Sequence, residues 1–285
     1  MKVAFLGLGV MGFPMAGHIS KGSCSVTVYN RNPQKVKEWL KKYKGIQALT
    51  IIEAVQNADI VLMCLGKDED VRNVCCSEIG VIQNMKKNAI LIDHTTVSAQ
   101  LAQELAAQCH TRHIDFLDAP ISGGQSGAEK GALTIMVGGK QETLEKAETV
   151  LSTYGKSIVL VGDVGSGQKA KMINQICIAG IIQGLSEGIN FGLKANLDIS
   201  KVLQAISHGA AQSWQMDNRG KSMSEDRFNF GFAIEWMIKD LHICIDEAQR
   251  LNCSLPITTQ ILEYYHKLEQ QELARLDTSA LIKLL

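Results

Sequence analysis

The sequence of 285 residues predicts a doubly wound α/β domain followed by an all-helical domain. Three observations lead to this fold class. Short β-rich runs alternate with helical stretches through the first half, several of those runs are apolar without interruption, and the β signal ends after about Val164. An unbroken apolar run such as residues 60–65 has no polar face, which is typical of a strand that helices cover on both sides.

The expected elements of the first domain follow one another at short intervals along residues 1–164. Strands are expected at residues 2–6, 25–29, 59–65, 89–93, 114–118, 133–137 and 157–161. A long apolar-rich helix over about residues 167–195 then leads into the second domain, residues 165–285. Because no flexible linker separates the halves, we expect this helix to join them, with a cleft where they meet.

Composition and charge exclude several classes of protein. Lys+Arg and Asp+Glu each total 29, so the formal net charge is zero and a nucleic-acid partner is disfavoured. The sequence has no uninterrupted apolar run of about 18 residues or more, and it enters a strand-like segment directly after Met1, so we expect a cytoplasmic protein with no membrane partner. Eight cysteines without CxxC spacing predict free thiols and no metal site.

Glycines recur along one ridge of the long helix, at Gly180, Gly184, Gly188 and Gly192. Residues four apart lie on the same face of a helix. Because each glycine costs about 1 kcal/mol relative to alanine in a helix interior, tight packing has to offset that loss. The ridge therefore predicts the close approach of another helix, from the same subunit or from a partner, and it favours a homodimer or homotetramer.

A glycine-rich turn stands directly after the first expected strand. Its pattern is GxGxxG, formed by Gly7, Leu8, Gly9, Val10, Met11 and Gly12. Gly7 would permit the tight turn, Gly9 would let a pyrophosphate approach the backbone, and Gly12 would let helix and strand pack closely. Since the motif lies between a strand and a helix, it predicts a dinucleotide held at the helix N-terminus.

The end of the second expected strand predicts which dinucleotide binds. An acidic residue is typical there in NAD-binding proteins, because it binds the ribose 2′-hydroxyl. This chain has Asn30, Arg31 and Asn32 instead. A neutral Asn30 and the guanidinium of Arg31 could bind a 2′-phosphate, so these residues predict NADP(H) as the preferred cofactor, with NAD(H) as the alternative.

With these motifs the chain resembles the β-hydroxyacid dehydrogenase family, which includes 3-hydroxyisobutyrate dehydrogenases and tartronate semialdehyde reductases. The segments that carry the resemblance are the glycine motif extended over residues 7–16, Asp-Ala-Pro-Ile-Ser-Gly-Gly at 118–124, residues 165–175, and Lys-Asp-Leu at 239–241. They span nearly the whole chain in the family's order. The resemblance implies an N-terminal Rossmann domain joined by a long helix to an all-α C-terminal domain, and a homo-oligomer.

The family's functional positions fall on particular residues of this chain. The resemblance implies that Lys171 is the general acid and base of a hydride transfer, since a lysine can move a proton at the substrate oxygen. It places the substrate carboxylate at Ser122, Gly123 and Gly124. There a hydroxyl and small residues with accessible N–H groups can hold an acid's oxygens without steric crowding.

The chain departs from the family pattern at the amide that faces the substrate. The family usually has Asn four residues after the lysine, whereas this chain has Gln175 there and Asn174 just before it. Both amides are therefore candidates. The positions that the resemblance assigns to the nicotinamide or the phosphates are Leu65, Thr95, Thr96, Phe232 and Lys239. For Lys239, a surface ion pair with Glu235 is the alternative.

The predicted function is hydride transfer between NADP(H) and a small β-hydroxy acid or its semialdehyde. Serine dehydrogenase-like and imine reductase-like activities are the enzymatic alternatives, although imine reductases usually carry Asp or Tyr in place of Lys171. A dinucleotide-binding sensor or assembly protein is the alternative outside catalysis, but it has no chemical need for a proton-transfer group. The substrate's side group stays open, because a pocket discriminates one methylene by only about 1–3 kcal/mol.

Overall fold

The computed structural model describes residues 1–285. The backbone packs as two compact units, Met1–Lys171 and Met172–Leu285. The division falls inside helix α9 (Ser166–Lys194) rather than between residues 164 and 165, where we expected the domain boundary. The first turn of α9 therefore belongs to the first unit.

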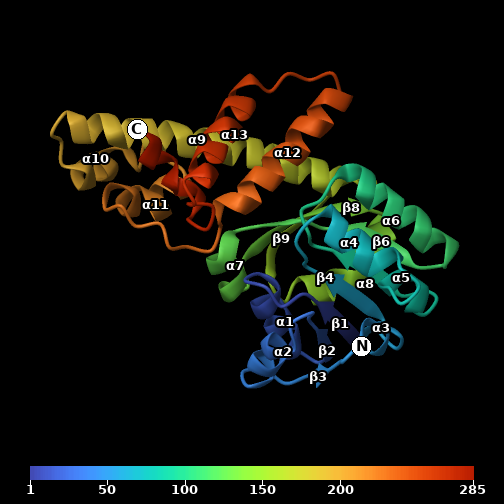
Figure 1. The fold of residues 1–285 in the computed structure, drawn as a ribbon. Coiled ribbons are helices and arrows are strands. Elements are labelled where there is room, and N and C mark those ends of the chain that lie inside the picture. Colours follow the sequence, from blue (N-terminus) through green and yellow to red (C-terminus); the bar gives the residue numbers. More distant parts are fainter. The chain divides into compact units, whose positions relative to one another are not determined.

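A single nine-stranded sheet runs through the first unit (Figure 1). Its strands are β1 (Lys2–Leu6), β2 (Ser25–Tyr29), β3 (Ile46–Gln47), β4 (Ile60–Met63), β5 (Ile90–Asp93), β6 (Asp115–Asp118), β7 (Ile121–Ser122), β8 (Leu133–Gly139) and β9 (Gly155–Gly162). The expected strands correspond to all of these except β3 and β7. Those two strands have two residues each, which is too short to show a periodic pattern.

The strand order is β3-β2-β1-β4-β5-β6-β8-β7, with β9 paired to β8. Strands β1 to β6 are parallel, whereas β8 runs antiparallel to β6 and β7 runs antiparallel to β8. Because β2 lies on one side of β1 and β4 on the other, the order reverses at β1. Such a sheet binds ligands at the carboxyl ends of the strands beside this reversal, and the glycine turn begins there with Gly7.

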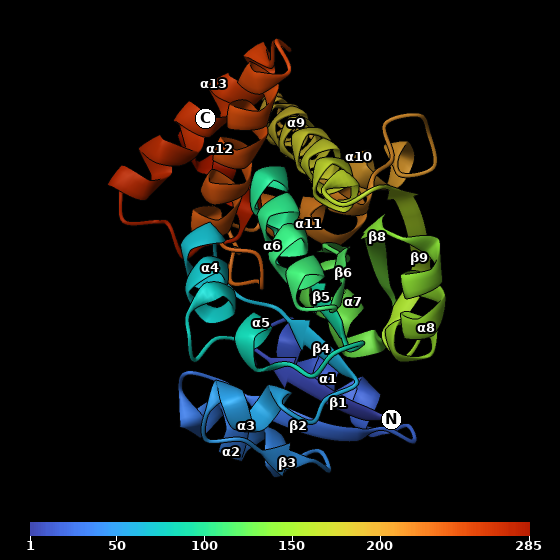
Figure 2. The ribbon, with the colours of Figure 1, turned by 90° about the vertical axis from the view of Figure 1, so that its right-hand side faces the viewer.

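Helices cover both faces of the sheet. Successive residues of a strand point to opposite sides, so apolar side chains lie on both faces and each face packs against helices. In β1, Val3 and Phe5 belong to one apolar core, whereas Ala4 and Leu6 belong to the other. The first core is covered by α1 (Gly12–Ser20), α2 (Pro33–Leu40), α7 (Gly124–Lys130) and α8 (Gln141–Leu151). The second is covered by α3 (Ile51–Val55) together with α4 (Asp68–Cys76), α5 (Val81–Asn84) and α6 (Ala99–Thr111), which lie side by side in Figure 2. The predicted doubly wound sheet is confirmed.

The second unit is built from helices. Besides the remainder of α9 it contains α10 (Ile199–Ile206), α11 (Trp214–Ser224), α12 (Ile234–Arg250), α13 (Pro256–Gln270) and a 3₁₀ helix, η1 (Thr278–Leu284). The side chains of Asp198 and Ser213 accept backbone N–H groups at the starts of α10 and α11. Leu241 of α12 and Tyr265 of α13 are fully buried in the shared core. The predicted all-helical domain is confirmed.

Helix α9 runs from Ser166 to Lys194, within one residue of the expected bounds at each end. By length and composition it is apolar enough to cross a membrane. Its residues Ala179, Ile182 and Ile189 are buried in the core of the second unit. At these positions, the apolar side chains of α9 therefore pack into the helical core.

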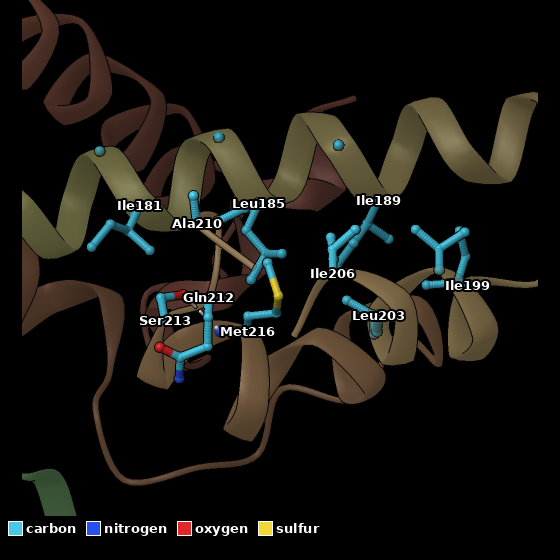
Figure 3. A pocket seen from close by; sticks show the side chains of 15 residues that line it. Ile181, Leu185, Ile189, Ile199, Leu203, Ile206, Ala210, Gln212, Ser213 and Met216 are labelled. Carbon is cyan, nitrogen blue, oxygen red and sulfur yellow. Dashed lines mark hydrogen bonds between the residues drawn. The ribbon is translucent and has the colours of Figure 1, made fainter. Parts of the chain in front are cut away.

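The glycine ridge of α9 borders an open apolar groove of about 540 Å³ in the second unit, with α10 and α11 on its other side (Figure 3). Gly180, Gly184 and Gly188 line this groove, and a Cβ atom at any of them would have no heavy atom within 4 Å. At Gly192, by contrast, a Cβ would lie 2.6 Å from the Cδ1 atom of Ile199. The expected close approach is therefore present within this chain at one glycine of the four. None of the candidate site residues lines the groove.

Candidate functional site

The glycine turn after β1 is shaped by close backbone approaches. Gly7 has a φ of +97°, and a Cβ there would lie 2.2 Å from the carbonyl oxygen of Cys64. At Gly12, the first residue of α1, a Cβ would lie 1.9 Å from the carbonyl oxygen of Gly7. Both positions therefore exclude a side chain. Gly9 is different, because nothing lies within 4 Å of its Cβ position. An anionic group has room to approach the backbone there, beside the N-terminus of α1.

The three residues after β2 have different structural roles. The Oδ1 atom of Asn30 accepts the N–H of Leu8 at 2.9 Å, which ties the glycine turn to the end of β2. The side chain of Asn32 caps α2 by accepting a backbone N–H at 3.0 Å. The Arg31 side chain is 95% exposed, and its guanidinium lies 4.0 Å from the carboxylate of Asp70. The Arg31 side chain therefore extends into solvent, and the bracing role of the two asparagines was not predicted.

Thr95 joins the ends of β4 and β5. Its hydroxyl oxygen accepts the N–H of Leu65 at 3.0 Å, and its own N–H donates to the Oδ1 atom of Asp93 at 2.9 Å. Both Thr95 and Asp93 are buried, and burial raises the pKa of Asp93 to about 7. Thr95 thus braces the loop after β5, while its neighbour Thr96 is half-buried.

Two buried side chains anchor the start of α9. Asp118, at the end of β6, accepts the N–H of Gly165 at 2.8 Å and the N–H of Gln168 at 2.9 Å. A carboxylate is favourable there because the first N–H groups of a helix have no partner within it. The amide of Gln168 donates to the carbonyl of Thr95 at 2.8 Å and accepts the N–H of Val97 at 3.1 Å. These four bonds fix the first turn of α9 against the ends of β5 and β6.

The predicted catalytic lysine follows one turn after this anchor. Lys171 is 7% exposed, so it is a buried lysine rather than a solvated one. In the same unit, Ser122 is the half-buried last residue of β7. Gly123 and Gly124 follow it with φ values of +129° and +60°, a backbone conformation that favours glycine. No heavy atom lies within 4 Å of the Cβ position of Gly124, so a ligand has room to approach the turn there, whereas a Cβ at Gly123 would lie 3.1 Å from the Cδ2 atom of Leu133.

A buried histidine links β5 to the segment that leads into this turn. His94 donates from Nδ1 to the carbonyl of Ala119 at 2.6 Å, and its Nε2 atom accepts the hydroxyl of Tyr154 at 2.8 Å. Burial lowers the pKa of His94 to about 4. The imidazole is therefore neutral at pH 7, and a neutral imidazole has the one donor and one acceptor that these contacts need.

The second unit contains a chain of polar side chains. Asn174 donates to the Oε1 atom of Gln175 at 2.7 Å, and Gln175 in turn donates to the Oδ2 atom of Asp240 at 2.7 Å. The Nζ atom of Lys239 lies 3.0 Å from the other carboxylate oxygen of Asp240. Gln175 and Asp240 are buried, so the amide of Gln175 is held in one orientation.

The alternative for Lys239, an ion pair with Glu235, is wrong. Lys239 pairs with Asp240 and has 19% of its side chain exposed, whereas Glu235 pairs with Arg275. Phe232 is partly buried against the helical core. The cofactor contacts expected of Phe232 and Lys239 stay predictions.

Sequence reasoning missed several supporting residues of the site. Gln168 and Asp240 lie inside the segments at 165–175 and 239–241, and His94 lies beside the two candidate threonines. Their position next to a motif was the available signal. Their partners are distant along the chain, as with the separation of 65 residues between Gln175 and Asp240, so the contacts themselves could not be read from spacing.

Comparisons with known proteins agree with this arrangement. Residues 2–162 match a family model described as the NAD binding domain of 6-phosphogluconate dehydrogenase. Residues 165–285 match one described as NAD-binding of NADP-dependent 3-hydroxyisobutyrate dehydrogenase. An uncharacterized oxidoreductase of Shewanella frigidimarina is 51% identical over 281 residues, covering 99% of this chain and 97% of that protein. The 2-hydroxy-3-oxopropionate reductase of Escherichia coli is 33% identical over 285 residues, covering 100% and 97%. The solved structure of Mycobacterium tuberculosis 3-hydroxyisobutyrate dehydrogenase with L-serine has a TM-score of 0.89 at 28% identity, covering 99% and 98%.

Proposed function

This chain belongs to the β-hydroxyacid dehydrogenase family of NAD(P)-dependent oxidoreductases, and on that premise we propose that it transfers a hydride between NADP(H) and a small β-hydroxy acid or its semialdehyde. The observation that carries the proposal is the burial of Lys171 one turn after a helix start that Asp118 and Gln168 anchor. Burying an ammonium group is costly. A lysine held in this way is suited to proton transfer at a fixed point.

The residues present fit a dinucleotide. Gly9 leaves open space beside the N-terminus of α1, where backbone N–H groups and the helix dipole favour a pyrophosphate. Leu65 and Thr96 follow the carboxyl ends of β4 and β5, the edge at which parallel sheets bind such ligands, so we place the nicotinamide there. When bound, the nicotinamide supplies or accepts the hydride.

Lys171 moves the proton that accompanies this hydride. In the reducing direction its ammonium donates a proton from Nζ to the substrate oxygen, and in the oxidising direction the neutral amine accepts the hydroxyl proton. The low exposure of the side chain keeps bulk water from competing for that proton.

The substrate carboxylate is assigned to the turn at Ser122, Gly123 and Gly124, where Ser122 carries a hydroxyl and the space beside Gly124 is open to a ligand. Both polar atoms of the Gln175 amide already have partners within the second unit. Gln175 is also buried, whereas Asn174 is half-buried and can meet a ligand, so we assign the substrate contact to Asn174 and a positioning role to Gln175.

The cofactor preference is assigned to Arg31. Its exposed guanidinium can bind a 2′-phosphate through two parallel hydrogen bonds, and no acidic side chain stands at Asn30 or Asn32 to repel that phosphate. Asp70, 4.0 Å from Arg31, competes for the same guanidinium and moderates the preference.

Replacing Lys171 by methionine tests the proposed chemistry. We expect kcat to fall by about 100-fold or more, the usual contribution of a general acid–base group, while NADPH still binds. Lys194→Met, at the exposed end of the same helix, is the matched control and should keep full activity. Turnover is followed by NADPH or NADH absorbance with methylmalonate, tartronate and succinic semialdehydes and glyoxylate, and in reverse with L-serine.

Two outcomes would contradict this assignment. Unchanged turnover in Lys171→Met removes the lysine from the mechanism. Tight NADPH binding with no oxidation across the whole panel indicates a dinucleotide-binding sensor instead.

We also propose that the chain acts as a cytoplasmic homodimer or homotetramer. The open groove beside Gly180, Gly184 and Gly188 supports this proposal, because no heavy atom of the chain lies within 4 Å of a Cβ at these glycines and a helix of a second copy would find room there. Light scattering measures the oligomeric state, and a monomer would contradict the proposal.

A further inference from the structure

Two histidines of the second unit meet across neighbouring helices. His242 lies on α12 and His266 on α13, separated by 24 residues of sequence, and their Nε2 atoms are 3.2 Å apart. The ring centroids are 5.3 Å apart and the ring planes are inclined by 53°. Both side chains reach solvent, and neither residue belongs to the segments that carry the family resemblance.

A carboxylate orients one of the two rings. The Nδ1 atom of His266 donates to the Oε2 atom of Glu269 at 3.1 Å. Because an ionised carboxylate can only accept, the proton is on Nδ1 and a neutral His266 has its lone pair on Nε2. A carboxylate on the far ring nitrogen is the usual partner of a metal-binding histidine, since it fixes the tautomer and the ring orientation and raises the basicity of the ligating nitrogen.

We propose that His242 and His266 bind a divalent late first-row transition ion, such as Zn²⁺, through their Nε2 atoms. Two imidazole nitrogens at about 2.0–2.1 Å from a tetrahedral Zn²⁺ are about 3.3 Å apart. The separation of 3.2 Å already matches this geometry, so the rings need to move little.

The change of tautomer on metal binding conserves the number of protons on the two rings. In the metal-free chain, His242 donates its Nε2 proton to the lone pair of His266. When the ion binds, His242 takes the other tautomer, with its proton on Nδ1, so that both Nε2 lone pairs point at the metal. Two neutral rings therefore bind the ion without a net loss of protons.

The site is open rather than fully enclosed by protein ligands. The chain has no group of three His, Cys, Asp or Glu side chains placed to hold a metal, so water fills the remaining coordination positions. The ion therefore exchanges readily with solvent and links α12 to α13 reversibly. Because the two ligands come together only in the packed helices, binding stabilises the folded second unit.

Calorimetric titration of the untagged protein with Zn²⁺ tests the site. The exposed Cys177 and Cys253 are first replaced by serine, because free thiols also bind Zn²⁺. We expect one ion per chain in this background and no binding after His242→Gln or His266→Gln. Glu269→Gln should weaken binding about 10–100-fold, the usual effect of removing such an orienting carboxylate.

The matched control is His208→Gln, which replaces another exposed histidine of the second unit and should leave Zn²⁺ affinity unchanged. Electron paramagnetic resonance with Cu²⁺ should show two coordinating nitrogen atoms in the parent protein and fewer in His266→Gln. Wild-type affinity in His266→Gln, or absence of binding in the parent protein, would overturn the proposal and leave only a hydrogen bond between the rings. Urea unfolding without metal confirms that each variant folds, and the test does not depend on the proposed catalytic function.

Discussion

Replacing Gln168 by methionine removes the amide contacts that anchor the start of α9. The side chain of Gln168 is fully buried, and it pairs the carbonyl of Thr95 and the N–H of Val97. Methionine fills a similar volume but leaves both backbone groups without their partner. An unsatisfied buried polar group costs about 1–3 kcal/mol, so the two together predict a loss of about 2–6 kcal/mol in unfolding free energy. That is a large part of the roughly 5–15 kcal/mol typical of a folded domain.

Urea unfolding followed by tryptophan fluorescence measures this loss. Trp39 is fully buried in the first unit, whereas Trp214 and Trp236 belong to the second, so replacing the latter two by phenylalanine makes the signal specific to the first unit. The control is Gln34→Met, an exposed position on α2, which should change stability by no more than about 0.5 kcal/mol. We also expect kcat to fall in Gln168→Met, because Lys171 is held by the same turn of α9. A stability loss below about 1 kcal/mol for Gln168→Met would refute the anchoring argument.

Two further predictions concern the cofactor preference and the pH dependence of stability. Arg31→Ala should lower the ratio of kcat/KM for NADPH over NADH by about 10-fold or more, because hydrogen bonds to charged groups contribute about 1.5–3 kcal/mol; an unchanged ratio would remove Arg31 from 2′-phosphate binding. Burial lowers the pKa of His94 from 6.5 to about 4, so the unfolded chain binds the proton first and the stability that neutral His94 contributes is lost as the pH falls from about 6.5 towards 4. Relative to His94→Gln, the wild type should lose about 2–3 kcal/mol between pH 7.5 and pH 4.5 in urea unfolding. Asp93 contributes to the pH dependence of stability with the opposite sign. Burial raises its pKa to about 7, so the stability that protonated Asp93 contributes is lost as the pH rises from about 4 to 7. Wild type and His94→Gln share this contribution, so it cancels when the two are compared. Equal pH dependence in wild type and His94→Gln would show that His94 is not buried in its neutral form.

Local patterns predicted most of the fold. The apolar runs located the longer strands, and the spacing of Gly7 and Gly12 located the turn before α1, because a backbone that passes within contact distance of another carbonyl leaves no room for a Cβ. The patterns did not place the division between the units inside α9. The first turn of the helix belongs to the first unit, where Asp118 and Gln168 tie it to strands far away in sequence.

The candidate site shows the same limit. The missing acid after β2 predicted Asn30 as a ligand for a 2′-phosphate, and that contact stays a prediction. What the sequence did not reveal is that the Asn30 side chain also braces the glycine turn. Residue type and spacing show which chemical groups a segment carries. Whether a group faces a ligand or a neighbouring backbone depends on what packs against it.

The doubly wound sheet, the long helix and the glycine turn could thus be predicted from the residues alone, because periodicity and the steric demands of glycine are properties of short segments. Three features became visible in the folded chain: Asp240 holds Gln175, Lys171 is buried, and His242 contacts His266. Each of these features depends on how helices and strands that are distant in the sequence pack together, and a pattern within a short segment does not predict that packing.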